Sequence, residues 1–273
     1  MPVSARPVEG LLTYLSESLK TEDQPFLHAA IELLGRRGQK EEFESALIAL
    51  KPYLSDGESA TRTVAANALT TLGRGARNTE VVAAQGFVAG WQIVGPFLND
   101  RQNVGFETVY APEENSGLDK FQTEYRWDFG GGKSNNKEIE LTWTDAYFED
   151  HSGDIHVAVQ MPVPIKFAVA YAKAEIISDS DRTVRAILAR DRRMTQKLWL
   201  NEEVVAEKID EVNEPSHHTV KLELRKGINS FFLKTSTYEG PWRLSLRLLD
   251  EKDQVAATGL RQVLPESQKT KGE

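Results

Sequence analysis

Residues able to carry out acid–base or nucleophilic chemistry are numerous in this sequence, but their spacing matches no catalytic motif. There is no cysteine, which excludes thiolate nucleophiles, disulfides and Cys-based zinc sites. No Gly-x-Ser-x-Gly elbow offers a serine nucleophile. Glycoside hydrolysis needs two carboxylates across one sugar-sized cleft, and the sequence offers Glu113, Glu114, Asp145, Glu149 and Asp150. Because an acidic chain always contains such pairs, we expect no enzyme and keep a glycoside hydrolase or other hydrolase as an alternative.

The histidines and the paired aspartates form no recognisable metal motif. The five histidines show neither HExxH nor HxH spacing, so no zinc site is predicted. Asp179 and Asp181 resemble the start of a calcium loop, but the later ligands and the glycine of that loop are missing. A tight turn between two strands is therefore the expected role of this segment. We expect no cofactor, and a structural calcium stays open as an option that is assigned to no residue.

The stretch FGGGKSNN at residues 129–136 invites comparison with a phosphate-binding loop. That loop needs Gly-x-x-x-x-Gly-Lys-Ser, and Trp127 occupies the position of its first glycine. The loop must also join a strand to a helix, whose N-terminal amides face the phosphate. Since both flanks have strand-like patterns, we expect a hairpin loop.

A functional aromatic residue is predicted at Trp199, because sugar-binding faces stack on exposed Trp or Tyr rings. Leu198 and Leu200 occupy one face of an expected strand, and Trp199 shares the other face with Lys197 and Asn201. A strand between two sheets would bury only one of these faces. The alternative is that Trp199 packs under a covering loop or against the helices.

The overall charge argues against two classes of partner. The chain has 33 Lys+Arg and 41 Asp+Glu residues, with a formal net charge of −8. This excess disfavours binding to nucleic acid and to anionic membranes. No apolar run has the length of a membrane span, so no membrane insertion is expected. No signal peptide is visible, although the lack of cysteine leads us to favour an extracytoplasmic location, periplasmic or secreted.

Two kinds of periodicity divide the chain. Apolar residues at helical spacing predict four amphipathic helices before about residue 75, with Gly35 as the stop of the second. Their apolar faces begin with Leu11, Phe26, Phe43 and Val64. The last of them, ATRTVAANALTTLGR at residues 60–74, resembles the second helix of a HEAT-type repeat.

From Phe87 to about Asp250 the apolar residues recur at every second position. This pattern is clear in segments 139–143, 155–159, 220–224 and 242–248. About ten such runs without an intervening helix predict an antiparallel β-sandwich. We therefore expect an α+β multidomain chain, with a HEAT-like helical bundle at 1–80, a jelly-roll sandwich at 87–262 and a disordered tail at 263–273.

Several segments in order resemble one family of sandwich modules. They are WQIVGPFLN (91–99), GFETVYAPEE (105–114), AYAKAEI (170–176), KLWLNEE (197–203) and RKGINSFFLKTS (225–236). Together they are similar to the galactose-binding-like or lectin-like jelly rolls of large bacterial multidomain proteins. The resemblance implies a module that is usually non-catalytic and is frequently attached to helical repeats. It also makes Trp91 and Phe97 expected core anchors, with Pro96 setting a bend.

This chain departs from the family pattern near residue 191. Relatives commonly carry Ser-Asp-Asp-Gly there, and the paired Asp of lectin-type members can hold a calcium that bridges to sugar. Here the segment is ARDRRMTQ (189–196), with Asp191 alone among arginines, and the turn Asn-Gly has become Asn201-Glu202. An acidic ligand or partner becomes more plausible at this basic cluster, to which Arg193 adds. The residues expected to form the ligand face are Arg190, Asp191, Trp199, Asn201, Tyr238 and Glu239.

The functional expectation is a non-catalytic binding or assembly module that acts within a larger complex or multidomain system. Its partner is expected to be a glycan or a protein. A dedicated carbohydrate-binding module is kept as an alternative, beside the hydrolase already named.

Overall fold

The computed structural model describes residues 23–37, 43–73, 78–126, 136–149, 152–163, 166–190, 194–209, 217–237, 242–251, 257 and 259–264. The first predicted helix and most of the glycine-rich loop at 129–136 lie outside these residues. The same holds for the tail from residue 265 onward.

Helices make up the N-terminal part of the described chain. They are α2 (Gln24–Arg37), α3 (Phe43–Leu50), the 3-10 turn η2 (Lys51–Ser55), α4 (Ser59–Leu72) and α5 (Asn78–Ala84). The first, second and third of these α-helices are the second, third and fourth predicted ones, whereas α5 was not predicted. Their buried apolar side chains form one cluster, which includes Ile31, Leu34, Leu50 and Leu69.

The sequence pattern suggested that the second helix ends at Gly35, but it does not. Helix α2 continues to Arg37, and Gly35 lies at its contact with α4. A Cβ atom at this position would lie 2.5 Å from the carbonyl oxygen of Ala68. The glycine is therefore required for close helix packing and not for a helix end.

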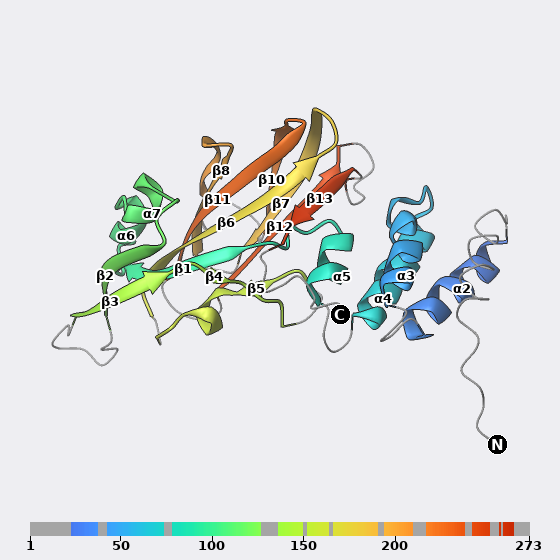
Figure 1. The fold of residues 1–273 in the computed structure, drawn as a ribbon, viewed down its shortest axis with the longest axis horizontal. Coiled ribbons are helices and arrows are strands. Elements are labelled where there is room, and N and C mark those ends of the chain that lie inside the picture. The colour runs from blue at the N-terminus through green and yellow to red at the C-terminus, as the bar shows by residue number, and fades with distance from the viewer. Residues whose placement is uncertain are drawn as a thin grey trace, which may run out of the picture.

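Two antiparallel sheets pack face to face in the C-terminal part of the described chain (Figure 1). The larger has the order β4-β1-β6-β11-β8-β9, with β13 also paired to β6, and the smaller has the order β10-β7-β12-β5. The large sheet consists of β1 (Gln92–Leu98), β4 (Thr144–Asp145), β6 (Ala168–Ser178), β8 (Met194–Leu200), β9 (Glu203–Ile209), β11 (Gly227–Thr237) and β13 (Leu260–Val263). The small sheet consists of β5 (Ile155–His156), β7 (Arg182–Arg190), β10 (His217–Leu224) and β12 (Arg243–Asp250). The predicted strand at 155–159 is shorter than expected, because a 3-10 turn, η3 (Val157–Gln160), replaces its second half.

The main core lies between the two sheets. Strand β6 contributes Ala168, Ala170, Ala172 and Ala174 to this cluster, and Trp91 is fully buried in it. Small side chains on a central strand leave room for larger ones from the facing sheet. The predicted β-sandwich and the predicted core position of Trp91 are thus confirmed.

A β-hairpin and two short helices cover part of the outer face of the large sheet. The hairpin β2 (Lys120–Arg126) and β3 (Asn136–Thr142), with the short helices α6 (Val104–Glu107) and α7 (Ala111–Glu114), lies at the end of the sandwich away from α2–α5 (Figure 1). Phe97 is buried here, with its ring centre 5.0 Å from that of Tyr110 and 5.5 Å from that of Tyr171. Its predicted core role is confirmed, in a second, smaller core.

The helices and the sandwich are joined by packing as well as by the chain. In α5, Val81 belongs to the helical cluster and Val82 to the sandwich core. Arg247 of β12 donates from Nε to the carbonyl of Gln85 at 3.0 Å and stacks on Phe87. Within the described residues, no helix is long and apolar enough to cross a membrane.

Candidate functional site

The outer face of the large sheet carries three successive rows of side chains. The middle row runs across the strands in register as Gln92, Lys173, Phe232, Trp199 and Val204. Directly opposed residues in a sheet point to the same side. Trp199 and Phe232 are therefore neighbours on this face, and their ring centres lie 5.3 Å apart.

The rows on either side differ in what covers them. One contains Val263, Glu175 and Ser230, again in register. The other contains Tyr171 and Lys234, both buried. The row with Glu175 and the middle row are not covered in this way, and together they form the floor of a cleft.

This cleft has a volume of about 730 Å³. One side comes from α7 and the loop after it, and the opposite side from the end of β13 and the β8–β9 turn. Its lining comprises Gly90, Gln92, Pro112, Glu113, Glu114, Ser116, Gly117, Lys173, Ala174, Glu175, Trp199, Glu202, Ser230, Phe231, Phe232, Val263 and Leu264. An aromatic floor with polar groups around it is the usual make-up of a small-molecule or sugar site.

Trp199 lies as its strand pattern predicted. Leu198 and Leu200 are buried in the core, and Trp199 is half-buried on the opposite face. The ammonium of Lys197 lies 4.8 Å from the Trp199 ring centre, but Lys197 does not line the cleft, whereas Trp199 does. One face of the indole is thus occupied, and the remaining surface is available to the cleft.

Asn201 is close to the cleft, but its side chain is used within the fold. It donates from Nδ2 to Oδ1 of Asn229 at 3.1 Å and accepts from the amide of Ser230 at 3.0 Å. Asn201 and Glu202 form the two-residue loop between β8 and β9, with positive φ angles of 50° and 70°. Asn201 thereby fixes the turn that presents Glu202 to the cleft.

For the other predicted ligand residues, the described structure gives no side-chain position. Asp191, Tyr238 and Glu239 lie outside the described residues, as do Arg192 and Arg193. Arg190 is the last residue of β7, where its backbone pairs with Leu244, and its side chain is not described. These positions stay predictions.

A buried ion pair, which sequence reasoning missed, holds the α7 side of the cleft. Lys234 is 2% exposed, and its Nζ lies 2.9 Å from Oε2 of Glu113. The same ammonium donates to the carbonyl of Thr108 at 2.7 Å. The Tyr171 hydroxyl also donates to Oε2 of Glu113, at 3.2 Å.

Burial has opposite effects on the two groups that contact Glu113. Burial lowers the pKa of Lys234, against the effect of the Glu113 carboxylate, because desolvation disfavours an ammonium. Burial also raises the pKa of Tyr171, and the Glu113 charge acts in the same direction. The strand pattern offered no signal for this pair, because Lys234 lies at an outward-facing position of β11, where an exposed lysine is the ordinary expectation.

Lys173, in the middle of the floor, is also held by the fold. Its Nζ donates to the carbonyl of Ser116 at 3.1 Å and lies 4.3 Å from the ring centre of Trp143. Burial lowers the pKa of Lys173, while Asp119 and Glu175 oppose this effect. Lys173 thus ties the loop after α7 to the sheet.

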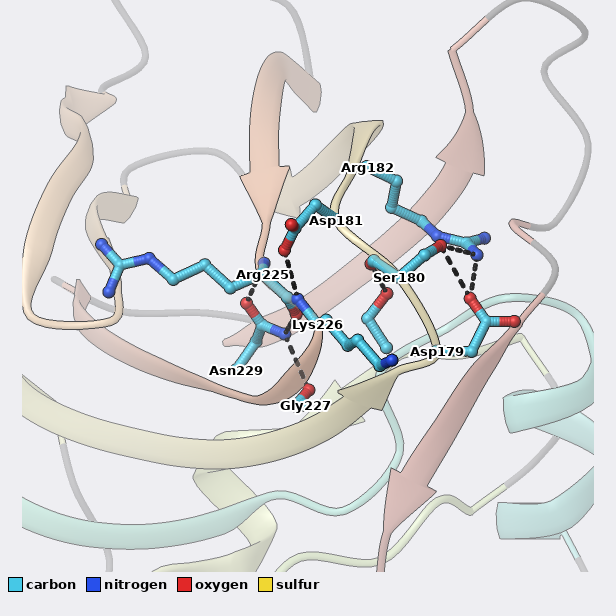
Figure 2. A network of polar contacts seen from close by, with 9 residues as sticks. Asp179, Ser180, Asp181, Arg182, Arg225, Lys226, Gly227 and Asn229 are labelled. Atoms are coloured by element: carbon cyan, nitrogen blue, oxygen red, sulfur yellow. Dashed lines mark hydrogen bonds and ion pairs between the residues drawn. The ribbon is translucent and has the colours of Figure 1, made fainter.

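The Asp179–Asp181 segment is a tight turn between β6 and β7, as predicted (Figure 2). Asp179 pairs with Arg182 and accepts from the Ser180 hydroxyl, while Asp181 accepts from the amide of Lys226 at 2.7 Å. These contacts use Oδ1 of each carboxylate and hold the turn together. Among the described residues, no cluster of three or more His, Asp or Glu side chains has the arrangement of a metal site.

The carboxylates considered for hydrolysis are divided among several places. Glu113 and Glu114 line the cleft. Asp145 accepts from Nε2 of Gln92 at 2.8 Å, and Glu149 pairs with His156 at 3.2 Å. Asp150 lies outside the described residues.

The flanks of the glycine-rich loop are strands, as expected. Strands β2 and β3 pair in antiparallel register up to Arg126 and Asn136, on either side of this loop. A phosphate-binding loop would have a helix on one flank, so this comparison fails.

Comparison with known proteins gives only partial structural likenesses. No protein-family model matches this chain, and no curated protein matches it. A family 35 carbohydrate-binding module from an environmental isolate has a TM-score of 0.28 and 16% identity, covering 38% of this chain and 77% of its own. The PA14 domain of the MpAFP antifreeze protein has a TM-score of 0.36 and 12% identity, covering 66% of this chain and 94% of its own. A β-glucosidase from Kluyveromyces marxianus in complex with glucose has a TM-score of 0.33 and 16% identity, with coverages of 52% and 17%.

Proposed function

We propose that this chain is a non-catalytic binding module, and that the cleft on the outer face of its large sheet binds a carbohydrate. The observation that supports this most is the in-register row that sets Trp199 beside Phe232 on the cleft floor. The apolar face of a pyranose ring packs well on such rings, and hydroxyl groups require the donors and acceptors that surround them.

The polar groups around the aromatic floor suit this ligand. Ser230, Gln92 and Glu175 line the floor, and Ser116 and Glu114 line the α7 side. These residues supply hydroxyl, amide and carboxylate groups, which together can both donate and accept hydrogen bonds. A ligand with many hydroxyl groups could satisfy such a lining, whereas a purely apolar ligand would leave it unpaired.

The proposal that the module is non-catalytic rests on Glu113, the one glutamate among the described cleft residues that is not exposed. Glu113 is engaged by both Lys234 and Tyr171, so it serves to hold α7 in place. We also propose that the helices are HEAT-like and that the sandwich has a jelly-roll topology. An extracytoplasmic location and membership of a larger assembly are further parts of this proposal.

A glycan array followed by calorimetry tests the function. The wild-type chain is expected to bind at least one oligosaccharide, and Trp199→Ala should weaken this binding about five- to thirtyfold, since loss of an aromatic contact costs about 1–2 kcal/mol. Phe26→Ala is a matched control, because Phe26 is also a partly exposed aromatic residue, 37% exposed. It belongs to α2, which lies at the opposite end of the molecule from α7 (Figure 1). Absence of binding to every glycan, with the fold intact by circular dichroism, would reject the proposal.

A further inference from the structure

The charges around the cleft are strongly unequal. Its lining includes Glu113, Glu114, Glu175 and Glu202, but Lys173 is the single cationic side chain among the described lining residues. The carboxylates come from separate elements, namely α7, β6 and the β8–β9 turn. They therefore surround a cleft with an aromatic floor and are not one local acidic patch.

Two of these carboxylates remain available to a ligand. Glu113 is neutralised by Lys234, and Glu175 lies opposite Ser230, whose hydroxyl donates to it at 3.4 Å. Glu114 and Glu202 are both exposed, and within the described part of the chain their side chains have no hydrogen bond or ion pair. Their positions are set by the buried Lys234 network and by the Asn201–Asn229 contact respectively.

The single lining cation does not compensate for these charges. The Lys173 ammonium is held between the Ser116 carbonyl and the Trp143 ring, so it is already solvated by the protein. An anionic glycan would thus enter a cleft that has exposed carboxylates and, among the described lining residues, no free ammonium. Repulsion between like charges in the cleft would weaken its binding.

We infer that the cleft selects glycans that carry amino groups, with the sugar ring on Trp199 and the ammonium groups near Glu202 and Glu114. This inference rests on the proposed carbohydrate-binding function and specifies the class of sugar. Trp199 contributes twice, because an indole ring packs on the apolar face of a pyranose and also attracts a nearby cation.

Three hexasaccharides with the same β-1,4 backbone separate charge from shape. They are the glucosamine hexamer (a fully deacetylated chitosan fragment), cellohexaose, and the glucuronic acid hexamer. Calorimetry is carried out at about pH 6, where the sugar amino groups are mostly protonated. The glucosamine hexamer is expected to bind at least tenfold more tightly than cellohexaose, the glucuronic acid hexamer is not expected to bind, and higher salt should reduce the preference.

A charge variant provides the control. The double variant Glu114→Gln and Glu202→Gln should weaken binding of the glucosamine hexamer about tenfold and leave cellohexaose unchanged, since charge-assisted hydrogen bonds are lost. The double variant Glu32→Gln and Glu58→Gln changes the net charge equally, but both residues lie on the helical part, and it should leave both affinities unchanged.

The outcomes distinguish this inference from the function on which it rests. If the glycan array gives a ligand but cellohexaose or the acidic hexamer binds as well as the glucosamine hexamer, the selectivity is wrong and the function stands. If the glucosamine preference is present but survives the Glu114 and Glu202 variant, the assigned carboxylates are wrong. If no glycan binds at all, both the function and the selectivity are rejected.

Discussion

Lys234 Nζ lies 2.9 Å from Glu113 Oε2 beneath the helix α7, and the lysine is 2% exposed. This pair connects the centre of the large sheet to one side of the cleft. Lys234→Met should destabilise the chain by about 3 kcal/mol, because it leaves the Glu113 carboxylate without its cation in a mostly buried position. Urea unfolding followed by circular dichroism measures the change.

The control for this pair is a double-mutant cycle with Glu113→Gln, which isolates the interaction energy. A coupling near zero would show that the pair does not hold α7. Lys120→Met breaks the exposed pair with Glu140, and it should leave the unfolding midpoint unchanged.

Gly105→Ala should destabilise the fold, because Gly105 lies directly against the end of β1. A Cβ atom there would be 2.2 Å from the carbonyl oxygen of Leu98 and 2.9 Å from Cα of Asn99. Relief of this overlap requires backbone movement, for which we expect a loss of about 2 kcal/mol. Gly57→Ala is the matched control, since a Cβ atom at Gly57 would have nothing within 4 Å. Equal effects of the two changes in thermal unfolding would contradict this explanation.

Glu202→Gly should stabilise the β8–β9 turn. Glu202 has a φ angle of 70°, which costs a non-glycine residue about 1 kcal/mol, and the unfolded-state entropy of glycine offsets part of the gain from removing this strain. The expected net gain is about 0.5 kcal/mol in chemical unfolding. Asn201→Gly should not stabilise, because it removes the contacts to Asn229 and Ser230. A loss of stability in Glu202→Gly would mean that this side chain has a structural contact.

Tyr53→Phe should change both the stability and its dependence on alkaline pH. The Tyr53 hydroxyl is buried and has no hydrogen-bond partner among the described residues, so its removal should stabilise by about 1 kcal/mol at neutral pH. Burial raises the pKa of Tyr53 from 10.0 to about 12. A raised folded-state pKa gives stability that is complete below pH 10.0 and is lost as the pH rises through about 12.

Wild type should therefore lose more stability than Tyr53→Phe between these pH values, measured by urea unfolding across a pH series. The lowered pKa of Lys234 acts in the opposite direction, since it adds stability as the pH rises towards the ordinary lysine value. It is common to both chains and cancels in the comparison. Tyr147→Phe, at an exposed position, is the control, and a pH profile that it shares with Tyr53→Phe would contradict the assignment.

The sequence by itself determined the local structure where a single periodicity was strong. Alternation in the segment 197–201 was enough to place Leu198 and Leu200 inwards and Trp199 outwards, because successive residues of a strand point to opposite faces. The turn at Asp179–Asp181 also followed from residue types, which favour turns for local reasons.

Gly35 shows where local patterns stop being informative. The sequence suggested a helix end, but the helix continues and the glycine permits contact with Ala68. The same residue type serves both purposes, and only the position of α4 distinguishes them. Helix α5 was missed because its apolar residues face two different cores, which removes the one-sided pattern on which helix prediction depends.

Only the tertiary structure decided what each outward-facing residue does. Lys234 and Phe232 lie on the same face of β11, yet α7 buries Lys234 and leaves Phe232 at the cleft. The cleft itself is made from α7, β6, β11, the β8–β9 turn and β13, which are far apart in the chain. Strand alternation is a property of neighbouring residues, whereas cover and cleft depend on which distant segments pack on a face, and the strand sequence does not contain that information.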